Sequence, residues 1–203
     1  MKKMKNNIIY TSSLVISIIV IIICIWFNIK LKKDFGANKT EIKQNELLMR
    51  QLNEDQITIL NSSNACISKS LYVSTIKGKQ VRIDTLIGNK KYLVLFFSSE
   101  DCGACVDFSL NQIRKIASQS NKQKILIFAS KYQLRDLYIL AKSIDLDEQI
   151  FSVETIGFPL EKKNVPFIFL INKELKSNCL FIPRKELPDQ TAVYLGIATK
   201  NLD

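Results

Sequence analysis

Two cysteines, Cys102 and Cys105, stand two residues apart shortly after the apolar run Tyr92–Phe97. A strand that leads into such a pair and then into a helix places the first sulfur at the helix N-terminus. There, unpaired backbone N–H groups and the helix dipole favour a thiolate. A thiolate is the species that attacks disulfides, and a nearby second thiol can resolve the mixed disulfide that forms. The spacing therefore predicts thiol–disulfide chemistry at this point of the chain.

The elements around the cysteines are predicted from hydrophobic periodicity. Ser70–Ile76 and Lys79–Asp84 alternate apolar and polar residues on either side of a Lys-Gly-Lys turn, as a β-hairpin does. Tyr92–Ser98 is a continuous apolar run, as expected of a central strand covered on both faces. After the cysteines, apolar residues at helical spacing predict one buried stripe, which consists of Val106, Leu110, Ile113 and Ala117.

Strands and helices are predicted to alternate over the rest of the chain. A strand is predicted at Lys124–Ser130 and a helix at Tyr132–Ile144, with Leu134, Leu137, Leu140 and Ala141 inward. The segment 149–162 is ambiguous, because Ile150–Val153 fits either a short strand or a turn. Strands follow at Phe167–Asn172 and Cys179–Ile182, and a closing helix is predicted at Lys185–Thr199 with Pro188 in its first turn. This order predicts an α/β fold, with a mixed sheet and helices on both faces.

The N-terminal part of the chain has the pattern of a membrane anchor. A basic segment, 1–7, precedes an apolar run, 8–27. Twenty helical residues span roughly 30 Å, the thickness of a bilayer's hydrocarbon core. No small-residue cleavage site follows, and the residues before Cys24 match a lipoprotein cleavage box poorly. An uncleaved transmembrane helix is therefore preferred over cleavage or lipidation, with a partly helical stalk at 28–66 and a globular domain at 67–203.

Charge and composition bound the location and the function. Lysines flank the apolar run on both sides, so the charge rule for orientation is close to a tie. Because a redox dithiol is useful on the oxidising side, we expect a single-pass protein of the cell membrane with its domain on the periplasmic, extracytoplasmic side. The net charge is +10, but the basic residues of the domain are interleaved with acids, so no nucleic-acid partner is expected. Histidine is absent, which excludes Ser-His and Cys-His catalysis and imidazole metal sites.

Residues from about 70 to 200 resemble the thioredoxin-fold family, in particular its membrane-anchored, extracytoplasmic TlpA/ResA-like thiol–disulfide oxidoreductases. Three features carry the resemblance: the strand that leads into Cys102–Cys105 and a helix, the segment Asn164–Phe169 with a proline before a strand, and the N-terminal hairpin. The resemblance implies a three-layer thioredoxin-like fold. It also implies that Cys102 is the nucleophile and Cys105 the resolving thiol.

The resemblance further implies the surroundings of the cysteines. Pro166, after a cis peptide bond, would lie against them, and the backbone of Val165 would pair with the substrate. Gly103 and Ala104 separate the cysteines in this chain, where family members often have a proline. The implied partners are protein dithiols or disulfides and an unidentified redox partner, and no cofactor or metal is expected.

The chain departs from the family pattern at residues that tune the redox chemistry. Asp101 stands where family members usually carry a tryptophan, and Phe96 and Phe108 occupy positions of acids found in some members. Glu100 and Asp101 are candidate pKa modulators, because a nearby carboxylate opposes the thiolate that the helix terminus favours. The two effects nearly cancel, which predicts a neutral-to-reducing couple.

Other functions remain open at this point. The cysteine pair could be half of a zinc site, for which only carboxylates or Cys66 and Cys179 remain as further ligands. Cys66 and Cys179 could instead form a structural disulfide with each other, or both could be unpaired thiols. A thiol peroxidase of related fold would need a Thr-x-x-Cys pocket and an arginine, but Ser99 stands at the threonine position. The last alternative is a non-enzymatic, anchored interaction module.

Overall fold

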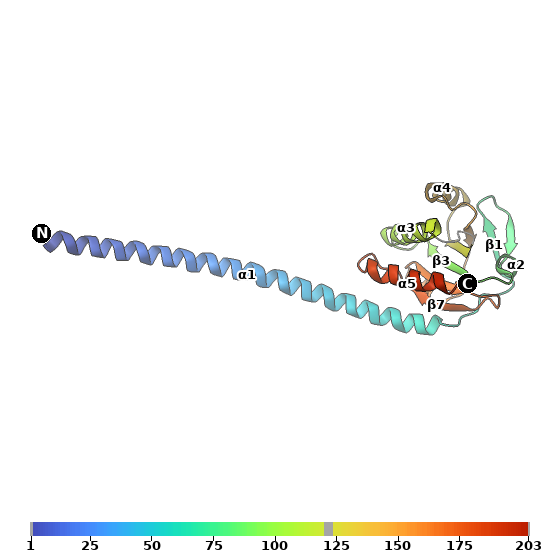
Figure 1. Cartoon of the computed structure of the whole chain (residues 1–203), viewed down its shortest axis with the longest axis horizontal. Coiled ribbons are helices and arrows are strands. Elements are labelled where there is room, and N and C mark those ends of the chain that lie inside the picture. Colours follow the sequence, from blue (N-terminus) through green and yellow to red (C-terminus); the bar gives the residue numbers. More distant parts are fainter. Residues whose placement is uncertain (1, 120–123, 203) are drawn as a thin grey trace. The chain divides into compact units, whose positions relative to one another are not determined.

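The computed structural model describes residues 2–119 and 124–202, and it describes their side chains except those of 2–22 and 34–41. The chain divides into two compact units, Met1–Asn53 and Glu54–Asp203. Helix α1 runs from Lys2 to Ser62 (Figure 1). Its residues up to Asn53 belong to the first unit, and its last turns, from Glu54, belong to the second.

The predicted membrane anchor, 8–27, lies mostly outside the residues whose side chains are described. Only residues 23–27 of this segment belong to the described set. Among described residues, no helix combines the length and the apolar character that crossing a bilayer requires. The anchor stays a prediction from the sequence.

The second unit is built around one mixed sheet. Its strands are β1 (Tyr72–Thr75), β2 (Gln80–Arg82), β3 (Tyr92–Ser98), β4 (Ile125–Ser130), β5 (Ile150–Val153), β6 (Phe167–Ile171) and β7 (Ser177–Phe181). In space they follow the order β2-β1-β5-β4-β3-β6-β7. β3, β4 and β5 are parallel to one another. On one side β6 pairs antiparallel with β3, and β7 antiparallel with β6; on the other side β1 pairs antiparallel with β5, and β2 antiparallel with β1. The predicted mixed α/β architecture is confirmed.

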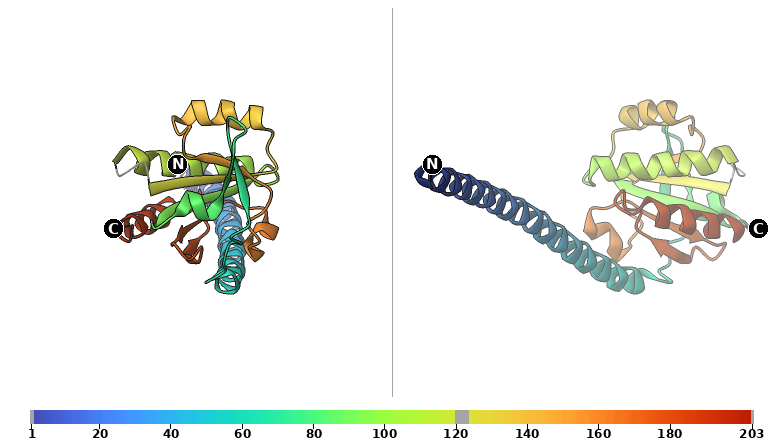
Figure 2. Two further views of the ribbon diagram at one scale, coloured as in Figure 1. Left: turned by 90° about the vertical axis from the view of Figure 1, so that its right-hand side faces the viewer. Right: turned by 60° about the vertical axis from the view of Figure 1, so that its left-hand side comes forward.

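The helices of this unit are α2 (Ile83–Ile87), α3 (Gly103–Gln119), α4 (Leu134–Ile144), the 3₁₀ helix η2 (Pro159–Lys163) and α5 (Pro188–Lys200). Helices α3, α4 and α5 bury their apolar side chains against one face of the sheet, and Figure 2 shows α3 and α4 running above the central strands. The predicted stripe on α3 is confirmed, since all four of its residues are buried.

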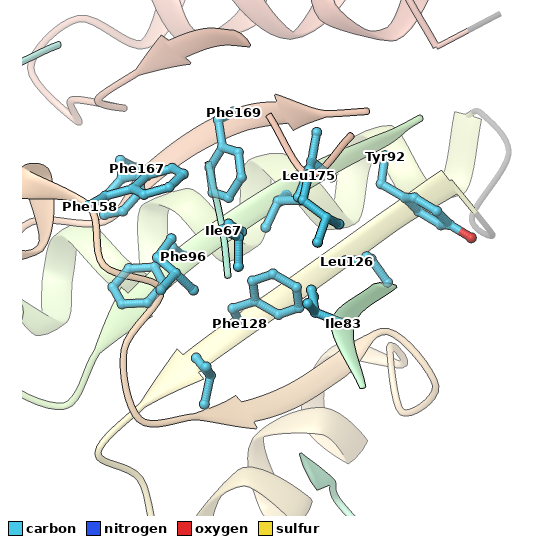
Figure 3. Close-up of a cluster of buried hydrophobic side chains, with 14 of the residues drawn as sticks. Ile67, Ile83, Tyr92, Phe96, Leu126, Phe128, Phe158, Phe167, Phe169 and Leu175 are labelled. Atoms are coloured by element: carbon cyan, nitrogen blue, oxygen red, sulfur yellow. The ribbon is translucent and has the colours of Figure 1, made fainter. Parts of the chain in front are cut away.

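The opposite face of the sheet carries a second core, which is rich in phenylalanine. Residues from α2, η2 and the segments beside them pack on it, and Ile59 near the end of α1 also contacts it. Phe96 on β3 stacks on Phe167 on β6, with 4.9 Å between the ring centroids (Figure 3). Both faces of the sheet are therefore covered, which explains why the central strands have no polar alternation.

Two expectations about α4 are wrong. The helix begins at Leu134, not at Tyr132, whose ring instead packs edge-on against Phe97 at 5.5 Å. Leu134 does not point into the core and is 40% exposed. As the first residue of the helix it lies near the hairpin turn, where its Cδ1 is 3.9 Å from the position that a Cβ on Gly78 would occupy.

Candidate active site

Cys102 lies just before α3, and Cys105 lies within the first turn of that helix. Helix α3 begins at Gly103, so Cys102 precedes its first residue, as the sequence predicts. The backbone N–H groups of Cys105 and Val106 both donate to the carbonyl oxygen of Cys102, at 2.9 and 3.0 Å. The first turn contains no acidic side chain that would compete for the N-terminal end of the helix dipole.

The two thiols differ in exposure and in acidity. Cys102 is exposed and Cys105 is half-buried, and both are free thiols. A hydrogen bond from the Cys105 thiol, with others from the backbone N–H groups of Cys105 and Ala104, lowers the pKa of Cys102. Burial raises the pKa of Cys105 to about 11, and the hydrogen bond with Cys102 adds to that rise. At neutral pH the exposed sulfur is therefore the better nucleophile.

Two charged residues near the thiols lie far from them in the sequence. The positive charge of Lys185 lowers the pKa values of both cysteines, and the negative charge of Glu186 raises that of Cys105. Sequence reasoning missed both residues because it assigned them to the start of the closing helix. In the structure they lie in the loop between β7 and α5, which begins only at Pro188. No local sequence signal connects this loop to the cysteines.

The two acidic residues just before Cys102 have partners of their own. Glu100 forms an ion pair with Lys131, with 2.7 Å between carboxylate oxygen and ammonium nitrogen. Asp101 is half-buried, and its carboxylate accepts a hydrogen bond from the backbone N–H of Ser98 at 2.9 Å. Burial raises the pKa of Asp101 above its ordinary value. Their effect on Cys102 stays a prediction.

The segment Asn164–Pro166 lies at the end of the sheet that leads to the cysteines. Asn164 adopts a left-handed conformation (φ 51°) that ends η2, and Pro166 is buried just before β6. Because β6 pairs antiparallel with β3, up to the pair Phe96–Phe167, this segment lies beside the C-terminal end of β3. The expectation of a cis bond before Pro166 is wrong, since the described residues contain no cis peptide. The trans form is the lower-energy one for a proline by about 0.5–1 kcal/mol.

A cavity of about 350 Å³ opens next to this segment. Its lining includes Ser98 and Ser130 at the ends of β3 and β4, and Asn164. Glu100 and Lys131, which form the ion pair described above, also line it. The cavity has both polar and apolar walls, since Phe96 also lines it, and it lies along the chain that leads into Cys102.

The remaining described cysteines lie elsewhere. Cys66 forms an isolated β-bridge with Lys176, and Cys179 lies in β7 with a positive φ of 53°. Both are free thiols, as is Cys24. Within the described part of the chain, no three His, Cys, Asp or Glu side chains form a group that could hold a metal ion.

Comparison with known proteins places the fold and leaves the activity open. No family model and no curated protein matches the sequence. A solved structure from Aquifex aeolicus VF5, described as a "putative electron transfer protein", superposes with a TM-score of 0.51 at 11% identity, over 68% of this chain and 94% of that one. The mixed α/β fold is consistent with a thioredoxin-like one.

Two further solved structures resemble the chain more weakly. One is an uncharacterized thioredoxin-like protein from Porphyromonas gingivalis, with a TM-score of 0.48 and 14% identity over 68% of this chain and 95% of that one. The other is a thiol:disulfide interchange protein from Bacteroides sp., with a TM-score of 0.46 and 13% identity over 66% of this chain and 90% of that one. At these identities the likeness concerns the fold alone.

Proposed function

We propose that this chain is a thiol–disulfide oxidoreductase that exchanges disulfides with other proteins through Cys102 and Cys105. The observation that carries the proposal is the asymmetry of the dithiol. An exposed cysteine with a lowered pKa stands at a helix N-terminus, one turn from a half-buried cysteine with a raised pKa. This arrangement suits a nucleophile and a resolving thiol.

The exchange proceeds in two steps, and each step forms one disulfide bond and breaks another. The Cys102 thiolate attacks one sulfur of a substrate disulfide, which forms a mixed disulfide and releases the other sulfur as a thiolate. Cys105 then loses its proton and attacks the Cys102 sulfur, which releases the second substrate sulfur and forms the Cys102–Cys105 disulfide. The substrate gains two electrons and the protein loses them. A dithiol partner must restore the reduced form.

The segment Asn164–Pro166 and the adjacent cavity are the proposed substrate surface. Among the described residues, the N–H of Val165 finds no backbone acceptor, and Val165 lies two residues before the start of β6. An extended substrate backbone could pair with it, as the family resemblance implies. The polar lining around Glu100 and Lys131 favours a substrate chain with polar side chains near its disulfide.

We further propose that the protein is tethered to a membrane by residues 8–27, with its redox domain on the extracytoplasmic side. In the described end of this segment, large apolar side chains on successive positions of α1 are more than half exposed to solvent: Ile23, Ile25, Trp26 and Phe27. A helix that is apolar on all sides is stable only when its surface is covered, and a bilayer would cover it.

Trapping tests the exchange mechanism. Cys105→Ser should accumulate mixed disulfides with substrate proteins, whereas Cys102→Ser should accumulate none and should lose exchange activity. Cys66→Ser and Cys179→Ser serve as matched controls and should behave as the wild type. If Cys102→Ser kept full biological function, a non-enzymatic module would be the better explanation. If the wild type consumed peroxide rapidly with a dithiol reductant, a thiol peroxidase would be the better explanation.

Labelling tests the location. A membrane-impermeant maleimide added to intact spheroplasts should modify the exposed Cys66 and Cys102, and the protein should stay in the membrane fraction after a high-salt wash. Labelling only after cell lysis would place the domain on the cytoplasmic side. Release by salt would show that no segment spans the bilayer.

A further inference from the structure

An ion pair joins the end of α1 to the loop that follows β7. The Nε of Arg184 donates to a carboxylate oxygen of Asp55 at 3.0 Å, and a second guanidinium nitrogen contacts the same oxygen. The side chains are 18% and 12% exposed, so the pair is largely shielded from water. Removing one partner of such a pair would leave a poorly solvated charge, which couples the position of Arg184 to that of Asp55.

The last residue of α1 is hydrogen-bonded to β7, since the hydroxyl of Ser177 donates to the carbonyl oxygen of Ser62 at 3.4 Å. The segment just after α1 is also attached to β7 and to the turn before it. The N–H of Ser177 donates to the carbonyl oxygen of Ala65, and the N–H of Ile67 donates to that of Leu175, each at 2.9 Å. Asp55 lies about two turns before this attached end of the same helix. Through its ion pair with Arg184, Asp55 can therefore hold the loop after β7 in one orientation.

The loop after β7 leaves the same edge of the sheet as the cysteines, because β3 and β7 both pair antiparallel with β6 and so run in the same direction. Within this loop, Arg184 begins a tight turn that contains Lys185 and Glu186. The N–H of Leu187 donates to the carbonyl oxygen of Arg184 at 3.1 Å, so Lys185 and Glu186 are the central residues of the turn. Both of these side chains are exposed, and neither forms an ion pair within the described part of the chain. Their placement beside the cysteines therefore depends on the backbone of the turn, and the turn is held at Arg184.

We propose that Asp55 is a positioning residue for the dithiol: through Arg184 it orients the turn 184–187 so that Lys185 stays beside Cys102. This inference rests on the proposed function, because it assigns Asp55 a role in the reactivity of the same two thiols. Asp55 acts at a distance and touches neither sulfur. It contributes by fixing the position of the positive charge of Lys185.

The test measures the alkylation rate of Cys102 in the full-length chain. Iodoacetamide is added over a range of pH, and the modified peptide is quantified by mass spectrometry. Asp55→Asn should slow the reaction at pH 7 by about 3- to 10-fold, because displacing the lysine charge raises the thiol pKa and so lowers the fraction of thiolate. Asp55→Glu should restore most of the rate, as should the charge-exchanged pair Asp55→Arg with Arg184→Asp.

Two comparisons separate positioning from a general loss of structure. Glu54→Gln is the matched control, since the neighbouring Glu54 is 68% exposed and pairs with Lys163 at 3.6 Å, and its rate should be that of the wild type. Lys185→Gln should slow Cys102 as much as Asp55→Asn does, and combining the two should slow it no further. Additive effects would overturn the proposal.

A second variant keeps the test possible if Asp55→Asn does not fold. If Asp55→Asn alone unfolds the chain, the double variant Asp55→Asn with Arg184→Gln removes both charges and should show the same slow alkylation. A wild-type rate in that variant would overturn the positioning role. A wild-type Cys102 that alkylates no faster than Cys105 would instead count against the proposed function itself.

Discussion

The Cys105 thiol donates a hydrogen bond to the Cys102 sulfur, and this bond is the largest cause of the lowered pKa of Cys102. The resolving thiol therefore helps to activate the nucleophile before it acts itself. Cys105→Ala removes the donor and should raise the pKa of Cys102, whereas Cys105→Ser keeps an O–H donor and should raise it less. The pH dependence of Cys102 alkylation measures both values. Equal pKa values in the two variants would show that the side-chain hydrogen bond has no effect.

The two thiols should titrate in separate pH ranges. Because only the thiolate reacts, the alkylation rate of Cys102 should rise with pH and level off once the pH exceeds its lowered pKa. Cys105 should react appreciably only as the pH approaches its pKa of about 11. Peptide-resolved alkylation between pH 5 and pH 11 checks both curves. A common midpoint for the two cysteines would contradict the predicted asymmetry.

Lys185 should raise the reduction potential of the couple. Its charge stabilises the thiolate of the reduced form, so Lys185→Gln should make the couple more reducing. The shift should be at most about 30 mV, the equivalent of one pKa unit for a two-electron couple, because the lysine is exposed and screened. Equilibration with glutathione measures it. Lys115→Gln, an exposed lysine further along α3, should leave the potential unchanged.

The wild-type potential should lie well below the value of about −120 mV that characterises strong oxidants. The thiolate has backbone N–H donors and one nearby lysine, and Gly103 and Ala104 supply no further side-chain donor. A titration that gave a potential near that of the strong oxidants would contradict the neutral-to-reducing assignment.

Phe167 should be a stability determinant of the candidate substrate surface. Its side chain is fully buried and stacks on Phe96, and it directly follows Pro166. Phe167→Ala should reduce the free energy of unfolding by about 3–5 kcal/mol through lost burial and the cavity left behind, and Phe167→Leu should cost less. Urea denaturation measures both. A change below about 1 kcal/mol for the alanine variant would mean that the core collapses around the gap.

Glu161 should stabilise the loop before the candidate substrate segment. Its carboxylate accepts hydrogen bonds from the backbone N–H groups of Phe158 at 2.7 Å and Ile156 at 3.2 Å. Glu161→Ala leaves these donors without their acceptor and should cost about 1–3 kcal/mol, whereas Glu161→Gln retains one acceptor oxygen and should cost less. Glu174→Ala, in an exposed turn, is the control for urea denaturation. Equal losses for Glu161→Ala and the control would contradict this role.

The strands and the reactive helix were predictable because their signals are local. Tyr92–Ser98 was assigned to a strand with its bounds unchanged, since burial on both faces of a sheet leaves a continuous apolar run. The start of α3 at Gly103 followed from the strand–cysteine–helix order. The inward position of Leu134 and the cis bond at Pro166 were wrong. Periodicity does not tell whether the first residue of a helix contacts the core, and a family pattern does not decide the isomer of one bond.

By itself, the sequence determined which two sulfurs could react and that the first would stand at a helix N-terminus, because both depend on neighbours within a few positions. Only the tertiary structure decided which charges surround them. Lys185 lies some eighty positions from Cys102, and the Asp55–Arg184 pair joins residues 129 positions apart. Electrostatic interactions act through space, so the sequence distance between two groups says nothing about their strength until the fold has brought them together.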